Sequence, residues 1–224
     1  STLAATSSND TVTPCHRRAQ RASSMPEGDT LRHAQALLQP VLEGRDLEDA
    51  WFRKLRGHRP RVGQRVEQVE AVGKHLLIHF DRRLSLDVHL GMAGYWRIAE
   101  TAPRPGPKLR IVLSTDAGHA LCYAAPVIQT FLRGDGASPV DHLGPDLSND
   151  QVDLDELVRR SRQVPPATPL AELLLDQRVA AGVGNVFKSE CLFIAGLNPF
   201  DSVEQISDDE LRHLWDIAHR QLVA

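Results

Sequence analysis

The period of the hydrophobic pattern changes along the chain, and this change limits the folds that the sequence can adopt. Between Asp46 and Tyr123 apolar and polar residues alternate, as on strands with one buried face, which predicts an antiparallel β region. A helical repeat precedes it, from Asp29 to Gly44. Further helical stretches follow over residues 151–162, 169–177, 185–195 and 207–222. The predicted fold class is α+β: an N-terminal β-sandwich domain with an N-terminal helix, followed by an all-helical domain.

Turn-forming residues separate these two regions. The segment 134–150 is rich in Gly, Pro, Asp and Ser, which is typical of a linker. We expect the β-sandwich domain over residues 25–146 and the helical domain over 147–224. Residues 1–24 hold one Leu, one Val and no aromatic residue, too few to bury a core. They are expected to be a disordered leader or an extension before a true start at Met25, with an organelle transit peptide as the alternative.

Composition and charge exclude several classes of protein. No run of about 18 apolar residues occurs, so no membrane-spanning helix is expected. The three cysteines are not at metal-ligand spacing, and their odd number favours a reducing compartment over a disulfide framework. The net charge is −3, and residues 151–224 alone carry −5, from seven Lys and Arg against twelve Asp and Glu. A nucleic-acid-binding function would therefore depend on a few placed groups and not on a basic surface.

Pro26 and Glu27 are the first candidates for chemistry. If translation begins at Met25 and the initiator is removed, Pro26 supplies a free secondary amine that is less basic than a Lys side chain. Such an amine is a nucleophile at neutral pH, and it forms an iminium directly with a sugar C1′. Glu27 could act beside it as acid or base. The alternative is that both are ordinary residues of a first helical turn.

Three candidates for DNA contact lie in the β region. Lys74 follows Gly73 at the start of a strand and could bind a phosphate, or it could point outward to solvent. His89, in the string HLGM, could donate to a phosphate or be a half-buried strand residue. Met92 lies between two glycines, as expected of a side chain that fills the gap left by a flipped nucleotide, although a core methionine is the alternative.

A fourth site is predicted where a helix begins in the all-helical region. Gly182 and Gly184 flank a turn, and Asn185 opens the helix, with Lys188 one turn later. Backbone N–H groups at such a terminus bind phosphate without net positive charge. Helix capping alone would also produce this pattern.

Taken together, the strings MPEG, VGK, HLGM and QRVAAGVGNVFKSE…GLNP resemble the formamidopyrimidine-DNA glycosylase and endonuclease VIII family. They occur in the family's order and cover nearly all of residues 25–224, and MPEGDT resembles the endonuclease VIII-like branch. The resemblance implies that the second domain is a helix–two-turn–helix domain and that DNA is clasped between the two domains. It also implies a bifunctional glycosylase and AP lyase, without a redox cofactor, that removes oxidised bases, pyrimidines favoured.

The same resemblance assigns roles to individual residues. Pro26 attacks C1′ of the flipped nucleotide, Glu27 assists base loss, and β- and δ-elimination follow. The residues that match phosphate-contacting or void-filling positions are Lys74, His89, Asn185 and Met92. Lys74 is grouped with the catalytic residues Pro26 and Glu27, Lys188 is grouped with the DNA-binding residues, and no metal ligand is assigned.

Three departures from the family pattern matter. Thr30 stands where many members have a second Glu, so no catalytic carboxylate is assigned there. The family's four-cysteine zinc finger has no counterpart in the chain, so no metal cofactor is expected. The residues before Met25 would make the Pro26 nitrogen an amide, so the alternative function is an inactive module that binds damaged DNA. An RNA-binding helical domain fused to a β domain is a further alternative, which the MPEG string disfavours.

The expected partner is double-stranded DNA that contains oxidised bases or abasic sites, bound by a monomer. The expected location is the bacterial cytoplasm, at the nucleoid. It becomes an organelle or the nucleus if residues 1–24 are a true leader.

Overall fold

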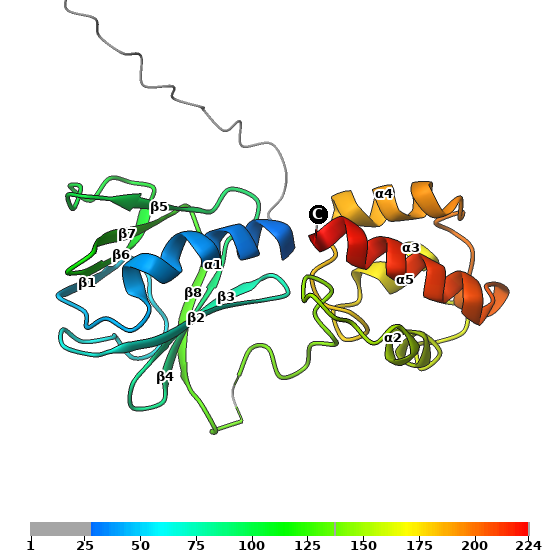
Figure 1. The fold of residues 1–224 in the computed structure, drawn as a ribbon, viewed down its shortest axis with the longest axis horizontal. Helices are drawn as coiled ribbons and strands as arrows, with labels where there is room; N and C mark the ends of the chain where they lie inside the picture. The colour runs from blue at the N-terminus through cyan, green and yellow to red at the C-terminus, as the bar shows by residue number, and fades with distance from the viewer. Residues whose placement is uncertain (1–27, 137, 224) are drawn as a thin grey trace, which may run out of the picture.

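The computed structural model describes residues 28–136 and 138–223. They form a β-sandwich with one long helix packed on it, joined by an irregular segment to a group of helices (Figure 1). The predicted α+β class is confirmed, with the β region first and the helical region second. Within these residues, no helix has both the length and the hydropathy needed to cross a membrane.

Two four-stranded antiparallel sheets make up the sandwich. The first has the order β1 (Asp49–Phe52), β6 (Leu109–Thr115), β7 (Gly118–Tyr123) and β5 (Tyr95–Ala99). The second has the order β2 (Val66–Val72), β3 (His75–Phe80), β4 (Leu84–His89) and β8 (Val127–Leu132). Their apolar faces and α1 (Gly28–Leu42) enclose one core, in which Leu38 and Ile78 are fully buried.

The expected end of the β region, at Tyr123, is wrong. β8 lies beyond it and pairs with β4 along its whole length, from Leu84 opposite Leu132 to His89 opposite Val127. The strand is six residues long, and its side chains do not alternate clearly between buried and exposed. The sequence pattern of this segment does not identify it as a strand, and its pairing with β4 stabilises it as one.

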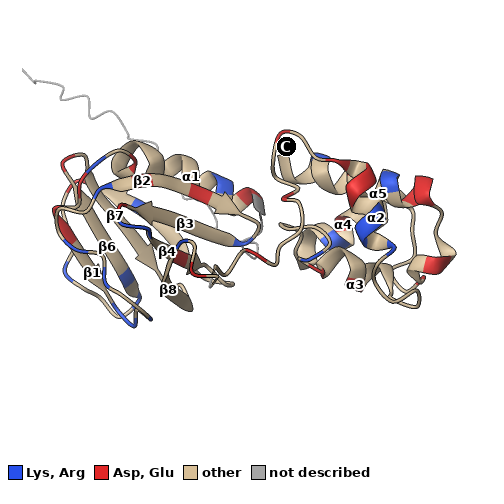
Figure 2. Cartoon of the chain, turned by 90° about the horizontal axis from the view of Figure 1, so that it is seen from below, with Lys and Arg blue, Asp and Glu red and all other residues tan. Residues whose placement is uncertain are grey.

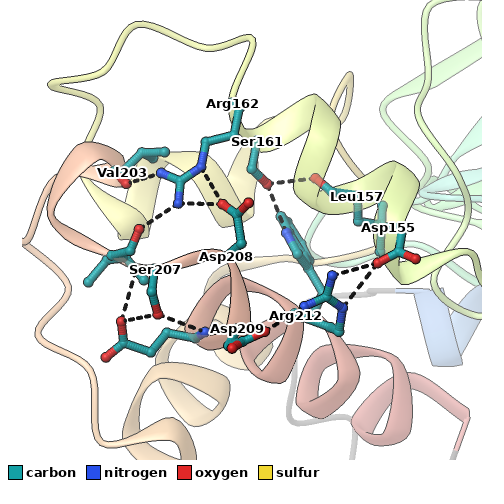
Figure 3. A network of polar contacts seen from close by, with 12 residues as sticks. Asp155, Leu157, Ser161, Arg162, Val203, Ser207, Asp208, Asp209 and Arg212 are labelled. Atoms are coloured by element: carbon teal, nitrogen blue, oxygen red, sulfur yellow. Dashed lines mark hydrogen bonds and ion pairs between the residues drawn. The ribbon is translucent and has the colours of Figure 1, made fainter.

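The helical domain contains α2 (Leu154–Ser161), α3 (Leu170–Leu175), α4 (Asn185–Ala195), the 3₁₀ turn η1 (Val203–Gln205) and α5 (Asp208–Val223). All four predicted helices are confirmed, the first two with shorter bounds. Their apolar faces pack around Trp215, which is fully buried. Its indole N–H donates to Ser161 Oγ at 2.9 Å, and that hydroxyl donates to the Leu157 carbonyl at 2.7 Å (Figure 3).

Arg162 fixes the chain that leads into α5. Its guanidinium donates to the carbonyls of Val203 and Ile206, at 2.6 Å each, and pairs with Asp208 at 2.7 Å (Figure 3). Ser207 and Glu210 form a capping box at the start of α5. The Glu210 carboxylate accepts from the Ser207 N–H at 2.9 Å, and the Glu210 N–H donates to Ser207 Oγ at 3.3 Å.

In the segment expected to be a linker, the described residues 134–136 and 138–150 form no helix or strand, but part of the segment packs on the helical domain. The Gly144 N–H donates to the Gln177 carbonyl, and the Leu147 N–H donates to the Ala181 carbonyl. Leu147 is fully buried among the apolar residues of that domain. The chain is thus anchored to the helical domain before α2 begins.

Candidate active site

The start of α1 lies at the boundary between the domains. Pro26 and Glu27 lie outside the described residues, and α1 begins directly after them, at Gly28. The N-terminal end of this helix points toward the helical domain (Figure 1). In its second turn, Arg32 donates from Nε to Ser148 Oγ at 3.0 Å. The first turns of α1 therefore contact the segment that leads into the helical domain.

Lys74 lies in the two-residue turn between β2 and β3, one residue before the strand in which it was expected. It is half-buried and lies before the first residue of β3, so it is not a strand residue. Gly73 precedes it with a φ of 56°, a conformation that glycine adopts without strain. A Cβ on Gly73 would lie 3.0 Å from the Ala181 Cβ. The turn that carries Lys74 is therefore pressed against the helical domain.

His89 ends β4, and its ring is held by a backbone contact. The Gly91 N–H donates to His89 Nδ1 at 3.1 Å. In the neutral ring the hydrogen is consequently on Nε2, which can donate to a ligand. Burial lowers the pKa of His89, and the nearby His75 and Lys74 lower it further. The expected donation from His89 to a phosphate is consistent with this geometry.

Asp87, two residues before His89 on β4, is a buried carboxylate. Asp87 is fully buried, with Oδ1 2.9 Å from His75 Nδ1, and Oδ2 accepts from Gln129 Nε2 at 2.9 Å. Since a carboxylate offers only acceptors, His75 Nδ1 carries the hydrogen in this contact. The His75 ring meets the His89 ring edge-on, with centroids 5.4 Å apart. Asp87 thus orients one imidazole, which packs against the other.

Met92 occupies a turn that projects from the sandwich. The Gly94 N–H donates to the Leu90 carbonyl at 2.8 Å and closes this turn. Gly91 has a φ of 60°, and a Cβ on it would lie 2.7 Å from the Pro126 ring. Met92 is 78% exposed, so the alternative of a core methionine is wrong.

Asn185 begins α4, as predicted. Gly184 occupies the N-cap position and provides no side-chain cap. Lys188, one turn later, donates from Nζ to Asn185 Oδ1 at 3.3 Å. Gly182 has a φ of 110°, and its N–H donates to Gln177 Oε1 at 3.1 Å. This turn contacts Gly73, so the structure brings the Lys74 turn and the approach to Asn185 together across the domain boundary.

Comparison with known proteins identifies the family. Residues 25–127 match the formamidopyrimidine-DNA glycosylase N-terminal domain, and residues 143–223 match the helix–two-turn–helix domain of the same glycosylase. The chain belongs to the formamidopyrimidine-DNA glycosylase and endonuclease VIII family.

Individual relatives agree with this assignment. The chain is 36% identical over 205 residues to a probable endonuclease 8 2 of Streptomyces coelicolor, covering 89% of this chain and 74% of that protein. It is 37% identical over 185 residues to the DNA-(apurinic or apyrimidinic site) lyase Nei2 of Mycolicibacterium smegmatis, covering 82% and 72%. The crystal structure of the MutM (Fpg) protein of Thermus thermophilus superposes with a TM-score of 0.75 at 29% identity, covering 88% and 74%. The predicted enzyme class, a DNA glycosylase with AP lyase activity, is confirmed.

Sequence reasoning missed several polar residues of this glycosylase. Asp87 was not identified because it lies in a strand whose apolar and polar residues alternate, and the polar residues of such a strand are normally exposed. Asp146, which is 8% exposed, was not identified because it lies in the segment expected to be a linker. Residues 53–65 contain six Lys and Arg and no acidic residue, and this cluster was overlooked because residues 25–150 as a whole carry no net charge. Over the ribbon as a whole, basic and acidic residues are interspersed (Figure 2).

Metal ligands are the remaining feature of the site. Among residues 28–136 and 138–223, His, Cys, Asp and Glu side chains form no group of three that could hold a metal ion.

Proposed function

We propose that this glycosylase removes oxidised bases, pyrimidines favoured, from double-stranded DNA and then cleaves the strand at the abasic site. One observation carries the proposal: the Lys74 turn meets the Gly182 turn at the boundary where α1 begins. Candidate phosphate donors from both domains thus lie beside the start of the helix that follows Pro26. Such an arrangement suits a ligand held between the domains, close to the amine.

The first step is displacement of the damaged base. The free amine of Pro26 attacks C1′, the bond from C1′ to the base breaks, and the base leaves with its electron pair and a proton. Glu27 is proposed to protonate the ring oxygen as the sugar opens. The amine proton goes to the departing base, the ring bond from C1′ to the protonated oxygen breaks with its electron pair on oxygen, and the Pro26 nitrogen forms an iminium with C1′.

Strand cleavage uses the same iminium as an electron sink. Loss of a proton from C2′ breaks the C3′–O bond and releases one phosphate, which is the β-elimination. Loss of a further proton from C4′ breaks the C5′–O bond and releases the second phosphate, which is the δ-elimination. Water then hydrolyses the iminium and regenerates the amine, so that no redox cofactor is consumed.

The other candidate residues are proposed to hold the DNA. Lys74, His89 Nε2–H and the N-terminal end of α4 at Asn185 would contact phosphates next to the lesion, with Lys188 assisting. Met92 would enter the gap left by the flipped nucleotide, because an exposed, flexible apolar side chain can replace the lost stacking. One chain supplies all these groups, so we propose that a monomer acts. The relatives named above are bacterial, and the bacterial nucleoid is the proposed location.

Borohydride trapping on DNA that contains an abasic site tests the chemistry. Reduction of the iminium joins protein and DNA covalently. A form that begins at Pro26 should be trapped, whereas a form in which Met25 precedes Pro26 should not, because an amide nitrogen is not a nucleophile. If neither form is trapped, the proposed mechanism is wrong.

A second experiment tests the lesion preference. Single-turnover excision is compared on duplexes with an oxidised pyrimidine, an oxidised purine or an undamaged base at one position. Faster excision of the pyrimidine supports the proposal, and faster excision of the purine contradicts the preference but not the enzyme class.

A further inference from the structure

The carboxylate of Asp146 joins the two domains. Its Oδ2 accepts from the Gly73 N–H at 2.6 Å, across the domain boundary. Its Oδ1 accepts from the N–H and the hydroxyl of Ser148, at 2.8 and 2.7 Å. Asp146 is 8% exposed and Ser148 is 2% exposed, so water competes little for these bonds. One side chain therefore satisfies donors on both sides of the boundary.

Ser148 extends this connection to α1. Its hydroxyl donates to Asp146 and accepts from Arg32 Nε at 3.0 Å, and Arg32 Nη2 donates to Asn149 Oδ1 at 2.8 Å. A continuous series of hydrogen bonds thus runs from Gly73 through Asp146 and Ser148 to the second turn of α1. Each end of the series lies next to a candidate active-site group: Lys74 at one end, and the start of α1 at the other.

The same carboxylate touches the turn that leads to α4. Asp146 pairs with Ala181 as an isolated parallel β-bridge. A Cβ on Gly182 would lie 3.6 Å from Asp146 Oδ1. The Lys74 turn and the approach to Asn185 therefore meet at Asp146, and α1 is connected to it through Ser148.

We infer that Asp146 is a positioning residue, which sets the separation between the start of α1, Lys74 and the α4 N-terminus. The inference rests on the proposed function, and it goes further because it assigns the geometry of the site to a residue that is not proposed to touch DNA. Because these groups lie on elements that are not adjacent in sequence, only noncovalent contacts fix their relative positions. A displacement of about 1 Å between reacting groups can slow a reaction roughly 100-fold.

The Asp146→Asn variant separates positioning from binding. An amide keeps the shape of the carboxylate but has one oxygen, so either Gly73 or Ser148 would face an NH₂ group instead of an acceptor. With protein in excess over abasic-site DNA, we expect the saturating rate of borohydride trapping to fall about 10-fold to 100-fold. We expect the Kd for the same DNA to change less than about threefold, since the phosphate donors are still present.

Two further variants keep this test interpretable. Ser161→Ala removes a buried hydroxyl whose two hydrogen-bond partners, Trp215 and Leu157, both lie inside the helical domain, and should lower stability without changing the trapping rate. Ser148→Ala is milder than Asp146→Asn and should slow trapping in the same direction. In both Asp146→Asn and Ser148→Ala, hydrogen exchange at the Gly73 amide should accelerate.

The outcomes distinguish the inference from the proposed function. An unchanged saturating rate in Asp146→Asn, or an equal loss in Ser161→Ala, would overturn the positioning role. A loss confined to Kd would overturn it as well, because that result would place Asp146 in DNA binding. If wild-type protein is not trapped in any form, the proposed function fails. In that case, hydrogen exchange at the Gly73 amide in Asp146→Asn still tests whether Asp146 stabilises the contact between the domains.

Discussion

The imidazole of His75 lies edge-on against the imidazole of His89, with the ring planes at 84°. The Asp87 carboxylate accepts a hydrogen bond from His75 Nδ1, and the Gly91 N–H donates to His89 Nδ1. The orientation of His89 Nε2–H is therefore fixed before any DNA is bound. Preorganised donors of this kind lose little freedom when a ligand arrives.

The protonation of His89 should make DNA binding depend on pH. Its pKa is lowered in the free protein, mainly by burial, whereas a bound phosphate would raise it. Binding should then take up a proton, so the affinity should increase as the pH falls from about 8 to about 6. Fluorescence anisotropy at constant ionic strength measures this trend. In His89→Gln the component due to this residue should vanish, and an unchanged pH dependence would contradict the assignment.

Removal of the Lys74 charge should weaken DNA binding in a salt-dependent way. Each phosphate neutralised contributes about −0.9 to the slope of log K against log salt on duplex DNA. We expect the slope of Lys74→Gln to be less steep by about 1. Lys54→Gln, on an exposed residue in the 53–65 segment, provides a matched comparison. An unchanged slope in Lys74→Gln would exclude a phosphate contact at that position.

Shortening Met92 should affect base excision more than strand cleavage. A paired base must be flipped out of the stack, whereas an abasic sugar needs less unstacking. Met92→Ala should therefore slow single-turnover excision of an oxidised base by about 10-fold, and trapping on abasic-site DNA by less. Val62→Ala, at another exposed apolar side chain, is the control that should change neither rate. Equal effects of Met92→Ala on the two substrates would argue against the void-filling role.

The Glu70–His79 contact should stabilise the sandwich above acidic pH. Glu70 Oε2 lies 3.1 Å from His79 Nε2, and this hydrogen bond lowers the pKa of Glu70 below its ordinary value of 4.5. A carboxyl group whose pKa is lowered on folding contributes stability above the unfolded pKa, and loses it as the pH falls through the folded pKa. The carboxylate is 41% exposed, so Glu70→Gln should cost less than about 1 kcal/mol at neutral pH.

Urea unfolding at several pH values measures that difference. It should shrink to zero below pH 4.5, as the pH passes the lowered pKa of Glu70 in the wild-type protein. A difference that persists unchanged at low pH would assign it to packing and not to charge.

Local pattern was sufficient for much of the fold. The period of the apolar residues predicted α1 and all four later helices, and the Ser207 capping box was visible as residue types three positions apart. β8 was missed because its pairing with β4 stabilises a segment that has little pattern of its own. Lys74 was predicted to begin a strand, but β3 begins one residue later, at His75, because the turn residues Gly73 and Lys74 look in the sequence like part of a longer strand.

The candidate site was predictable only where a motif lies on one segment. Lys74, His89, Met92 and Asn185 each belong to a short string, and the roles of these residues and of Pro26 and Glu27 stay predictions. Asp87 and Asp146 have partners 12 to 73 positions away, His75 and Gly73, and no local pattern records such contacts. Buried carboxylates of this kind are found only once the donors around them are known.

Gly73 makes the surfaces of the two domains depend on each other at their contact. Its φ of 56° excludes most side chains, and its closeness to Ala181 excludes even a methyl group unless the opposite surface moves. The two turns are therefore complementary surfaces of one joint. A chimera that takes its sandwich from one relative and its helical domain from another should keep its geometry only if both sides of this joint come from the same parent.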